Sequence, residues 1–321
     1  MPTAPPLLDG SPPGLNPIQT KVVAGLMGAG DDRPSFDPLL PVRLLDLLEE
    51  GLAGAASRLG VGELVVAKHL LGQVHQCERM AMAEQREGFA WSARSACGTV
   101  AHKAIELSVF STDQPAPLDL VDRAIGRLLD ADEPWGPAEF IRNAPEAERA
   151  ELRAEANDRV VKFLECFPPL KKQWRPVLES RARVDLLERR VILKGKVDLA
   201  LGRRDGDRAR VLIVDFKTGT PHRGHVDDLR FYALLDTIRS GVPPFRVASY
   251  YLDAARWHHE DVTEDLLEAA AHRVVQGAVK LIELTVDRRE PAIAPGPACT
   301  YCRERTDCEG AARWATTLSA R

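Results

Sequence analysis

The sequence predicts an α/β protein with a helical first half and a sheet in its second half. Two apolar runs rich in Val, Ile and Leu, residues 191–201 and 211–217, flank a charged segment that holds the turn dipeptide Asp205-Gly206. This pattern is typical of two antiparallel strands joined by a tight loop. Long amphipathic patterns precede and follow the hairpin, and three closely spaced cysteines lie near the end of the chain.

Composition narrows the functional classes. A chain of 321 residues can bury a large core, and its length allows one large or two modest domains. The formal charge is -4, so any contact with DNA must come from a local basic surface. No apolar run of about 18 residues predicts a membrane span, and no signal-peptide pattern opens the chain. We therefore expect a cytoplasmic protein, in which the six cysteines favour metal or catalytic use over disulfides.

The first half of the chain is expected to be helical. The proline-rich residues 1–36 predict a flexible arm with one short helix near 18–26. A charged run within residues 137–167 indicates the solvated face of a helix, and Pro168-Pro169 end that helix. The apolar spacing predicts helices over 39–59, 61–82, 89–110, 119–129 and 137–167.

The second half alternates strands and helices. Besides the central hairpin we expect strands over 174–184 and 245–253, the first of which carries Glu179. Helices are predicted over 225–238, which a Ser-Gly pair and two prolines end, and over 263–284.

The central hairpin carries three charged residues that suit a metal centre. Asp198 lies on its first strand, and Asp215 and Lys217 lie two residues apart on its second, so they share one face. Burying such groups without a ligand is unfavourable, and carboxylate oxygens are the usual ligands of magnesium. A phosphodiesterase metal centre is one interpretation. Taken alone, the pattern favours the simpler one, an ordinary hairpin with an Asp215–Lys217 salt bridge.

An upstream helix offers a histidine. His102 and Glu106 are four residues apart and share a helix face. They form either a surface pair or a site in which the histidine reaches toward the hairpin.

The tail carries a second candidate site. Cys299, Cys302 and Cys308 follow the spacing C-x2-C-x5-C, and three thiols so close together indicate a metal or a cluster. A four-cysteine site needs one more ligand, and zinc and iron–sulfur both suit four thiolates. The candidates for the fourth ligand are Cys77, Cys97 and Cys166.

Together these residues resemble the RecB-like iron–sulfur branch of the PD-(D/E)XK nucleases, which includes CRISPR-associated adaptation exonucleases and AddB-type nuclease domains. The resemblance covers about residues 61–310, with two departures: Asp228 stands where the family has glutamine, and Glu78 follows Cys77 where proline is frequent. The motifs are Gly98 to His102 for G-x3-H, Gly195 to Asp198 for G-x-x-D, Asp215 to Lys217 for D-x-K, and Asp228 to Tyr232 at the position of Q-x3-Y.

The resemblance implies a restriction-endonuclease-like core, a mixed central sheet flanked by helices, with a helical N-terminal part and a cysteine-ligated cluster joining the two ends. It divides the chain into an arm (1–36), a helical region (37–172), a nuclease core (173–286) and a cysteine-rich tail (287–321). The implied activity is a Mg²⁺- or Mn²⁺-dependent deoxyribonuclease, an exonuclease that acts on single-stranded DNA or on ends.

The resemblance also implies roles for individual residues. Lys217 would orient or activate the attacking water, and Glu179 and Glu106 are further candidates for the metal surroundings. The implied metal ligands are His102, Asp198, Asp215 and the carbonyl of Phe216; those of a [4Fe–4S] cluster are Cys77, Cys299, Cys302 and Cys308; and those facing DNA are Tyr232, Arg223, Arg230 and Asp228.

Two other functions remain open at this level. One is a catalytically weak or inactive DNA-binding subunit of a repair or phage-defence complex. The other is a zinc-stapled structural protein whose aspartates are surface groups. The sequence holds no helicase P-loop, so a helicase partner would have to supply any unwinding.

Overall fold

The computed structural model describes residues 14–28, 33–111, 115–134, 136–203, 206 and 208–319. Asp205 of the predicted turn and residues 1–13 and 29–32 of the predicted arm lie outside this part. Helix α1, Pro17–Met27, matches the short helix predicted in the arm. In the described part of the chain, no helix is long and apolar enough to cross a membrane.

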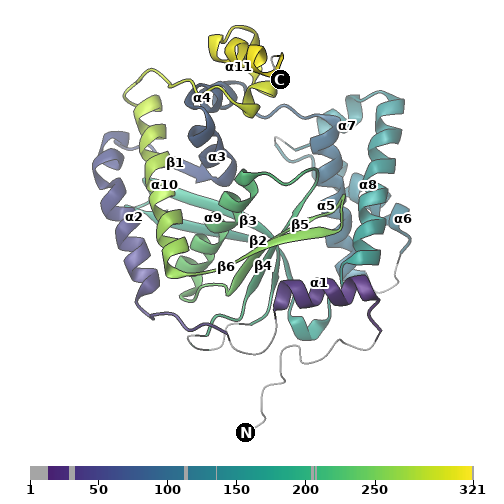
Figure 1. Ribbon diagram of the computed structural model, residues 1–321. Coiled ribbons are helices and arrows are strands. Elements are labelled where there is room, and N and C mark those ends of the chain that lie inside the picture. Colours follow the sequence, from purple (N-terminus) through teal and green to yellow (C-terminus); the bar gives the residue numbers. More distant parts are fainter. Residues whose placement is uncertain are drawn as a thin grey trace.

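A single mixed sheet forms the centre of the described structure (Figure 1). Strand β3 pairs with three neighbours: in parallel with β1, and antiparallel with β2 and β4. Strand β4 then pairs in parallel with β5, and β6 completes the sheet as an antiparallel edge. The strands are β1 Leu64–Ala67, β2 Val177–Leu186, β3 Val191–Leu201, β4 Leu212–Lys217, β5 Arg246–Tyr251 and β6 Arg256–Asp261.

Two groups of helices flank the sheet, as predicted (Figure 1). One group holds α2 Leu40–Ala56, α9 Arg223–Ser240 and α10 Glu264–Thr285, with α3 Lys68–Gln76 packed on α9 and α10. The other holds α5 Ala93–Phe110, α6 Pro117–Ala131, α7 Ala138–Asn143 and α8 Glu146–Cys166. Helices α4 Glu78–Glu87 and α11 Glu309–Ser319 lie together at one end of the molecule, with the short 3-10 turns Pro297–Thr300 and Arg303–Thr306 of the tail.

Side-chain caps fix the starts of α5, which carries His102, and of α10. Ser92 accepts a hydrogen bond from the backbone N–H of Ser95, and α5 begins at the next residue after this cap. The Thr263 hydroxyl does the same for Leu266 at the start of α10, close to the predicted start.

The prediction of one helix over 61–82 is wrong. Residues 64–67 form β1. This segment is rich in Val, which favours strands, and all four residues pair in parallel with residues 191–194 of β3. The helix that follows breaks at Cys77, whose φ of -161° and ψ of 118° are extended, and α4 starts afresh after it. The predicted helix over 137–167 is likewise two helices, α7 and α8, which separate at Ala144 and Pro145.

Candidate metal centre

Asp198 is the residue that joins the two halves of the site. It lies on β3, and its Oδ2 accepts a hydrogen bond of 2.7 Å from the backbone N–H of Phe216 on β4. Its other oxygen, Oδ1, lies 3.4 Å from Nδ1 of His102 on α5. The carboxylate is therefore oriented by the neighbouring strand and faces the upstream helix.

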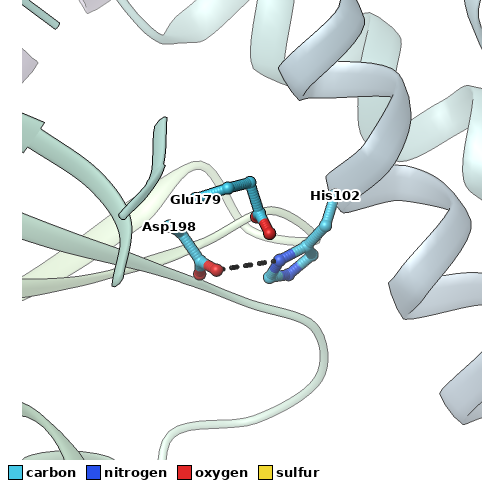
Figure 2. Close-up of side chains that lie close together, drawn as sticks. All are labelled: His102, Glu179 and Asp198. Carbon is cyan, nitrogen blue, oxygen red and sulfur yellow. Dashed lines mark ion pairs between the residues drawn. The ribbon is translucent and has the colours of Figure 1, made fainter. Parts of the chain in front are cut away.

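Glu179 completes a group of three ligands with His102 and Asp198. One ligand atom from each residue lies within 4.8 Å of the others, and Figure 2 shows the three side chains pointing toward one another. Glu179 sits on β2 between the register pairs Leu178–Leu199 and Ser180–Val197, which places it opposite Asp198. Its φ of 53° is unusual for a residue within a strand. Backbone strain of this kind clusters at functional sites.

The carboxylates determine the charge of His102. Burial alone would lower the pKa of this imidazole, but Asp198, Asp215 and Glu179 outweigh it, and the pKa is raised above its ordinary value. The surroundings of His102 therefore favour a positive charge, whether a proton or a cation carries it.

Next to this trio, two lysines and two aspartates alternate in charge, and we call them the lysine–aspartate quartet: Lys68, Asp215, Lys217 and Asp228. Lys217 Nζ lies 2.7 Å from Asp215 Oδ2 and donates to Asp228 Oδ2 at 2.9 Å. Lys68 Nζ lies 3.5 Å from Asp215 Oδ1 and 3.8 Å from Asp228 Oδ2. The salt bridge expected between Asp215 and Lys217 is thus part of a larger network.

Asp215 and Lys217 both stay charged despite their burial. Burial alone would raise the pKa of Asp215, which is 1% exposed, but Lys68 and Lys217 lower it to about 2. Burial would likewise lower the pKa of Lys217, and Asp215 and Asp228 reverse this and raise it. Lys217 therefore remains an ammonium at neutral pH and acts as a hydrogen-bond donor.

Gly195 and Tyr232 explain how α9 approaches the site. A Cβ on Gly195 of β3 would lie 2.9 Å from Cδ1 of Leu235 and 3.0 Å from Cε1 of Tyr232, so only glycine admits α9 this close. Tyr232 is 2% exposed, and Lys68 Nζ lies 4.9 Å from the centre of its ring. This buried tyrosine supports the quartet, and its position does not suit the DNA-facing role expected for it.

The other predicted residues take up different positions. Arg230 donates twice to Glu260 on β6, at 2.9 and 2.6 Å, whereas Arg223 is exposed at the start of α9. Glu106 forms an ion pair of 2.8 Å with Lys103 rather than with His102. Phe216 packs its ring among aromatic side chains of α8 and β5, so only its backbone faces Asp198.

Lys68 is the site residue that sequence reasoning missed. It begins α3 directly after β1, in a stretch predicted as one continuous helix. If V-V-A had been recognised as the end of a strand, Lys68 would have been expected just after that strand, next to the hairpin.

The structure brings Cys77 to the tail. The thiol of Cys302 has a raised pKa, first through burial and then through the neighbouring sulfurs of Cys77, Cys308 and Cys299. Among the described residues, no three of these four sulfurs lie within 4.8 Å of one another.

Charged contacts hold the tail on α4. Glu304 forms ion pairs with Arg79 and Arg86, and Arg303 pairs with Glu87 at 3.0 Å. Glu78 accepts a hydrogen bond of 2.9 Å from the backbone N–H of Ala292. The glutamate that replaces the frequent proline after Cys77 therefore fastens the segment that leads into the cysteine tail.

Cys97 is expected to resist alkylation in the folded protein. Its thiol is buried on α5, and burial raises its pKa to about 11, although Arg159 contacts the sulfur. At pH 8 only about one thiol in a thousand would then be the reactive thiolate. We expect iodoacetamide and peptide mass spectrometry to find Cys97 unmodified until urea unfolds the chain. Rapid labelling of Cys97 under native conditions would contradict its burial.

Comparison with known proteins gives the family. A solved structure described as "Putative exonuclease" from Eubacterium rectale is similar over 74% of this chain and 87% of that one, at 14% identity and a TM-score of 0.45. Another, named SSO0001, is similar over 82% and 94%, at 15% identity and a TM-score of 0.36. No curated protein matches the sequence. A sequence profile of the PD-(D/E)XK nuclease superfamily matches residues 70–309, most of the chain, and the chain belongs to this superfamily.

Proposed function

We propose that the protein is a Mg²⁺- or Mn²⁺-dependent deoxyribonuclease that hydrolyses phosphodiester bonds in single-stranded DNA or at DNA ends. The observation that carries this proposal is the convergence of His102, Glu179 and Asp198 beside the Asp215–Lys217 pair. One imidazole and two carboxylates offer the nitrogen and oxygen donors that these cations accept. Asp215 and the carbonyl of Phe216 are the further ligands that we propose.

Each residue has a distinct task in the proposed reaction. The bound cation would supply Lewis acidity, which polarises the scissile phosphate and lowers the pKa of water. Asp198 holds both His102 and the backbone of Phe216. Asp215 stays ionised because two ammoniums face it. Lys217 keeps its proton and donates hydrogen bonds, so we assign it to orientation and charge stabilisation rather than to general-base catalysis.

A cleavage assay tests this function. Protein purified without oxygen should degrade labelled single-stranded or end-containing DNA with Mg²⁺ or Mn²⁺, and EDTA should stop the reaction. Asp198→Asn should reduce the rate about 1,000-fold or more, because it weakens both the ligand group and the contact to His102. Asp185→Asn is the matched control, since Asp185 lies on the surface of the same sheet and pairs with Arg183.

Failure to cleave any single- or double-stranded DNA or RNA would refute the nuclease. It would favour the alternative, a nuclease-fold subunit that binds DNA without turnover in a repair or defence complex. One observation supports that alternative: Lys217 already forms ion pairs with Asp215 and Asp228, which compete with a substrate for its ammonium. Retained binding of DNA without cleavage would identify this case.

We also propose that Cys77, Cys299, Cys302 and Cys308 hold a [4Fe–4S] cluster, with zinc as the alternative. The support is the gathering of Cys77, Cys299 and Cys308 around Cys302, because four thiolates suit an iron–sulfur cluster or zinc. Such a cluster would tie α4 to the tail, and a reducing cytoplasm would keep the thiols available.

A further inference from the structure

We propose that Lys68, rather than Lys217, is the ammonium that contacts a phosphate of the DNA backbone. This inference rests on the proposed nuclease function and assigns the substrate contact within the same site. It arises from a difference between the two lysines of the quartet: one is locked between carboxylates, and the other is loosely held and accessible.

Lys217 has little capacity left for a phosphate. Its Nζ lies 2.7 Å from Asp215 Oδ2 in an ion pair and donates a hydrogen bond of 2.9 Å to Asp228 Oδ2. Its side chain is only 12% exposed. With a carboxylate on either side and so little exposed surface, this ammonium is less accessible to a phosphate of the DNA backbone than Lys68 is.

Lys68 is held less tightly and reaches solvent. It lies 3.5 Å from Asp215 and 3.8 Å from Asp228, both longer than a charge-assisted bond, and its side chain is 32% exposed. An ammonium has three donors, and within the described residues Lys68 makes one long hydrogen bond, to Asp215. It therefore retains donors for an incoming anion.

The surroundings of Lys68 suit a phosphate contact. The ring of Tyr232 lies 4.9 Å from its ammonium and attracts it through a cation–π interaction. Lys68 is also the first residue of α3, and the residue before it, Ala67, makes no side-chain cap hydrogen bond. The first N–H groups of α3 therefore have no side-chain cap, and they favour an anion near the start of this helix.

The charge balance of the quartet also supports a phosphate contact by Lys68. The quartet has two positive and two negative groups, so it does not repel a phosphodiester by itself. Without Lys68 the two aspartates outnumber the remaining ammonium, and the site becomes negative where the phosphate must enter. Lys68 thus prevents repulsion and offers the contact.

The test measures binding of a fluorescein-labelled 12-nucleotide single strand by fluorescence anisotropy, with EDTA present so that cleavage cannot interfere. Lys68→Met keeps the aliphatic stem and should raise the Kd at least about 10-fold, with a salt dependence weakened by about 0.7 in log–log slope. Lys68→Arg should stay within about 3-fold of wild type. Lys21→Met is the control, because Lys21 is an exposed lysine on α1.

A double variant separates a specific contact from charge balance. The double variant, Lys68→Met with Asp228→Asn, removes one charge of each sign and keeps the quartet neutral. It can therefore be measured even if the single variant Lys68→Met does not fold. We expect its affinity to remain weak. Affinity equal to wild type in the double variant, or an unchanged Kd and salt slope in Lys68→Met, would overturn the role of Lys68. Because binding is measured in EDTA, this result is independent of whether the wild type cleaves DNA, which tests the nuclease function separately.

Discussion

Replacement of Asp215 by asparagine is expected to abolish cleavage and to destabilise the protein as well. The carboxylate is buried and faces two ammoniums, from Lys68 and Lys217, which hold its pKa at about 2. Asparagine of the same shape would leave both lysines with Asp228 as their remaining partner in the quartet. Breaking a buried ion pair in this way costs about 3 kcal/mol, so the catalytic group also contributes to stability.

Urea unfolding in EDTA at neutral pH measures this effect. Because the pKa of Asp215 is lowered in the folded state, its contribution is present above the ordinary carboxyl pKa and is lost as the pH falls toward about 2. The difference between wild type and Asp215→Asn should therefore shrink on acidification. Asp185→Asn again serves as the surface control. An Asp215→Asn variant that is more stable than wild type would show that the quartet does not satisfy the aspartate.

Replacement of Cys77 by serine is the second change with a large expected effect. Under the cluster proposal, this thiol connects the start of α4 to a tail more than half the chain away. Loss of the link would open a long loop, and we expect it to lower the free energy of unfolding by on the order of 4 kcal/mol. We expect the variant to lose the visible absorbance band of the protein and its bound iron, and to unfold at a lower temperature.

Cys166→Ser is the matched control for the cysteine site. Cys166 is also half-buried, but it ends α8, away from the tail. Iron and absorbance should be unchanged in it. Zinc in place of iron in the wild type would support the alternative metal, and wild-type iron content in Cys77→Ser would remove Cys77 from the ligand set.

The central hairpin was predictable because its signals are local. Apolar runs rich in Val, Ile and Leu marked β3 and β4 almost to the residue, and the two-residue spacing put Asp215 and Lys217 on one face. The mixed sheet between helices was also confirmed. Strand β6, by contrast, was missed because its sequence R-W-H-H-E-D is that of a polar edge, which lacks the apolar pattern of a buried strand.

The rest of the site depends on contacts that no local pattern carries. Lys68 meets Asp215 only because β1 pairs with β3, and helix and strand look alike in a short apolar run. Tyr232 was expected to face DNA, yet Gly195 on a distant strand lets α9 approach and bury it. Asp228 looked like a weakness of the motif, and in the structure it balances the lysines of the quartet.

The most direct test of the metal centre is a crystal structure of the protein with Mn²⁺, analysed by anomalous scattering. We expect a strong anomalous peak within bonding distance of Asp198 and His102, with Glu179 or Asp215 beside it. A peak bound elsewhere, with His102 and Asp198 still paired with each other, would contradict it.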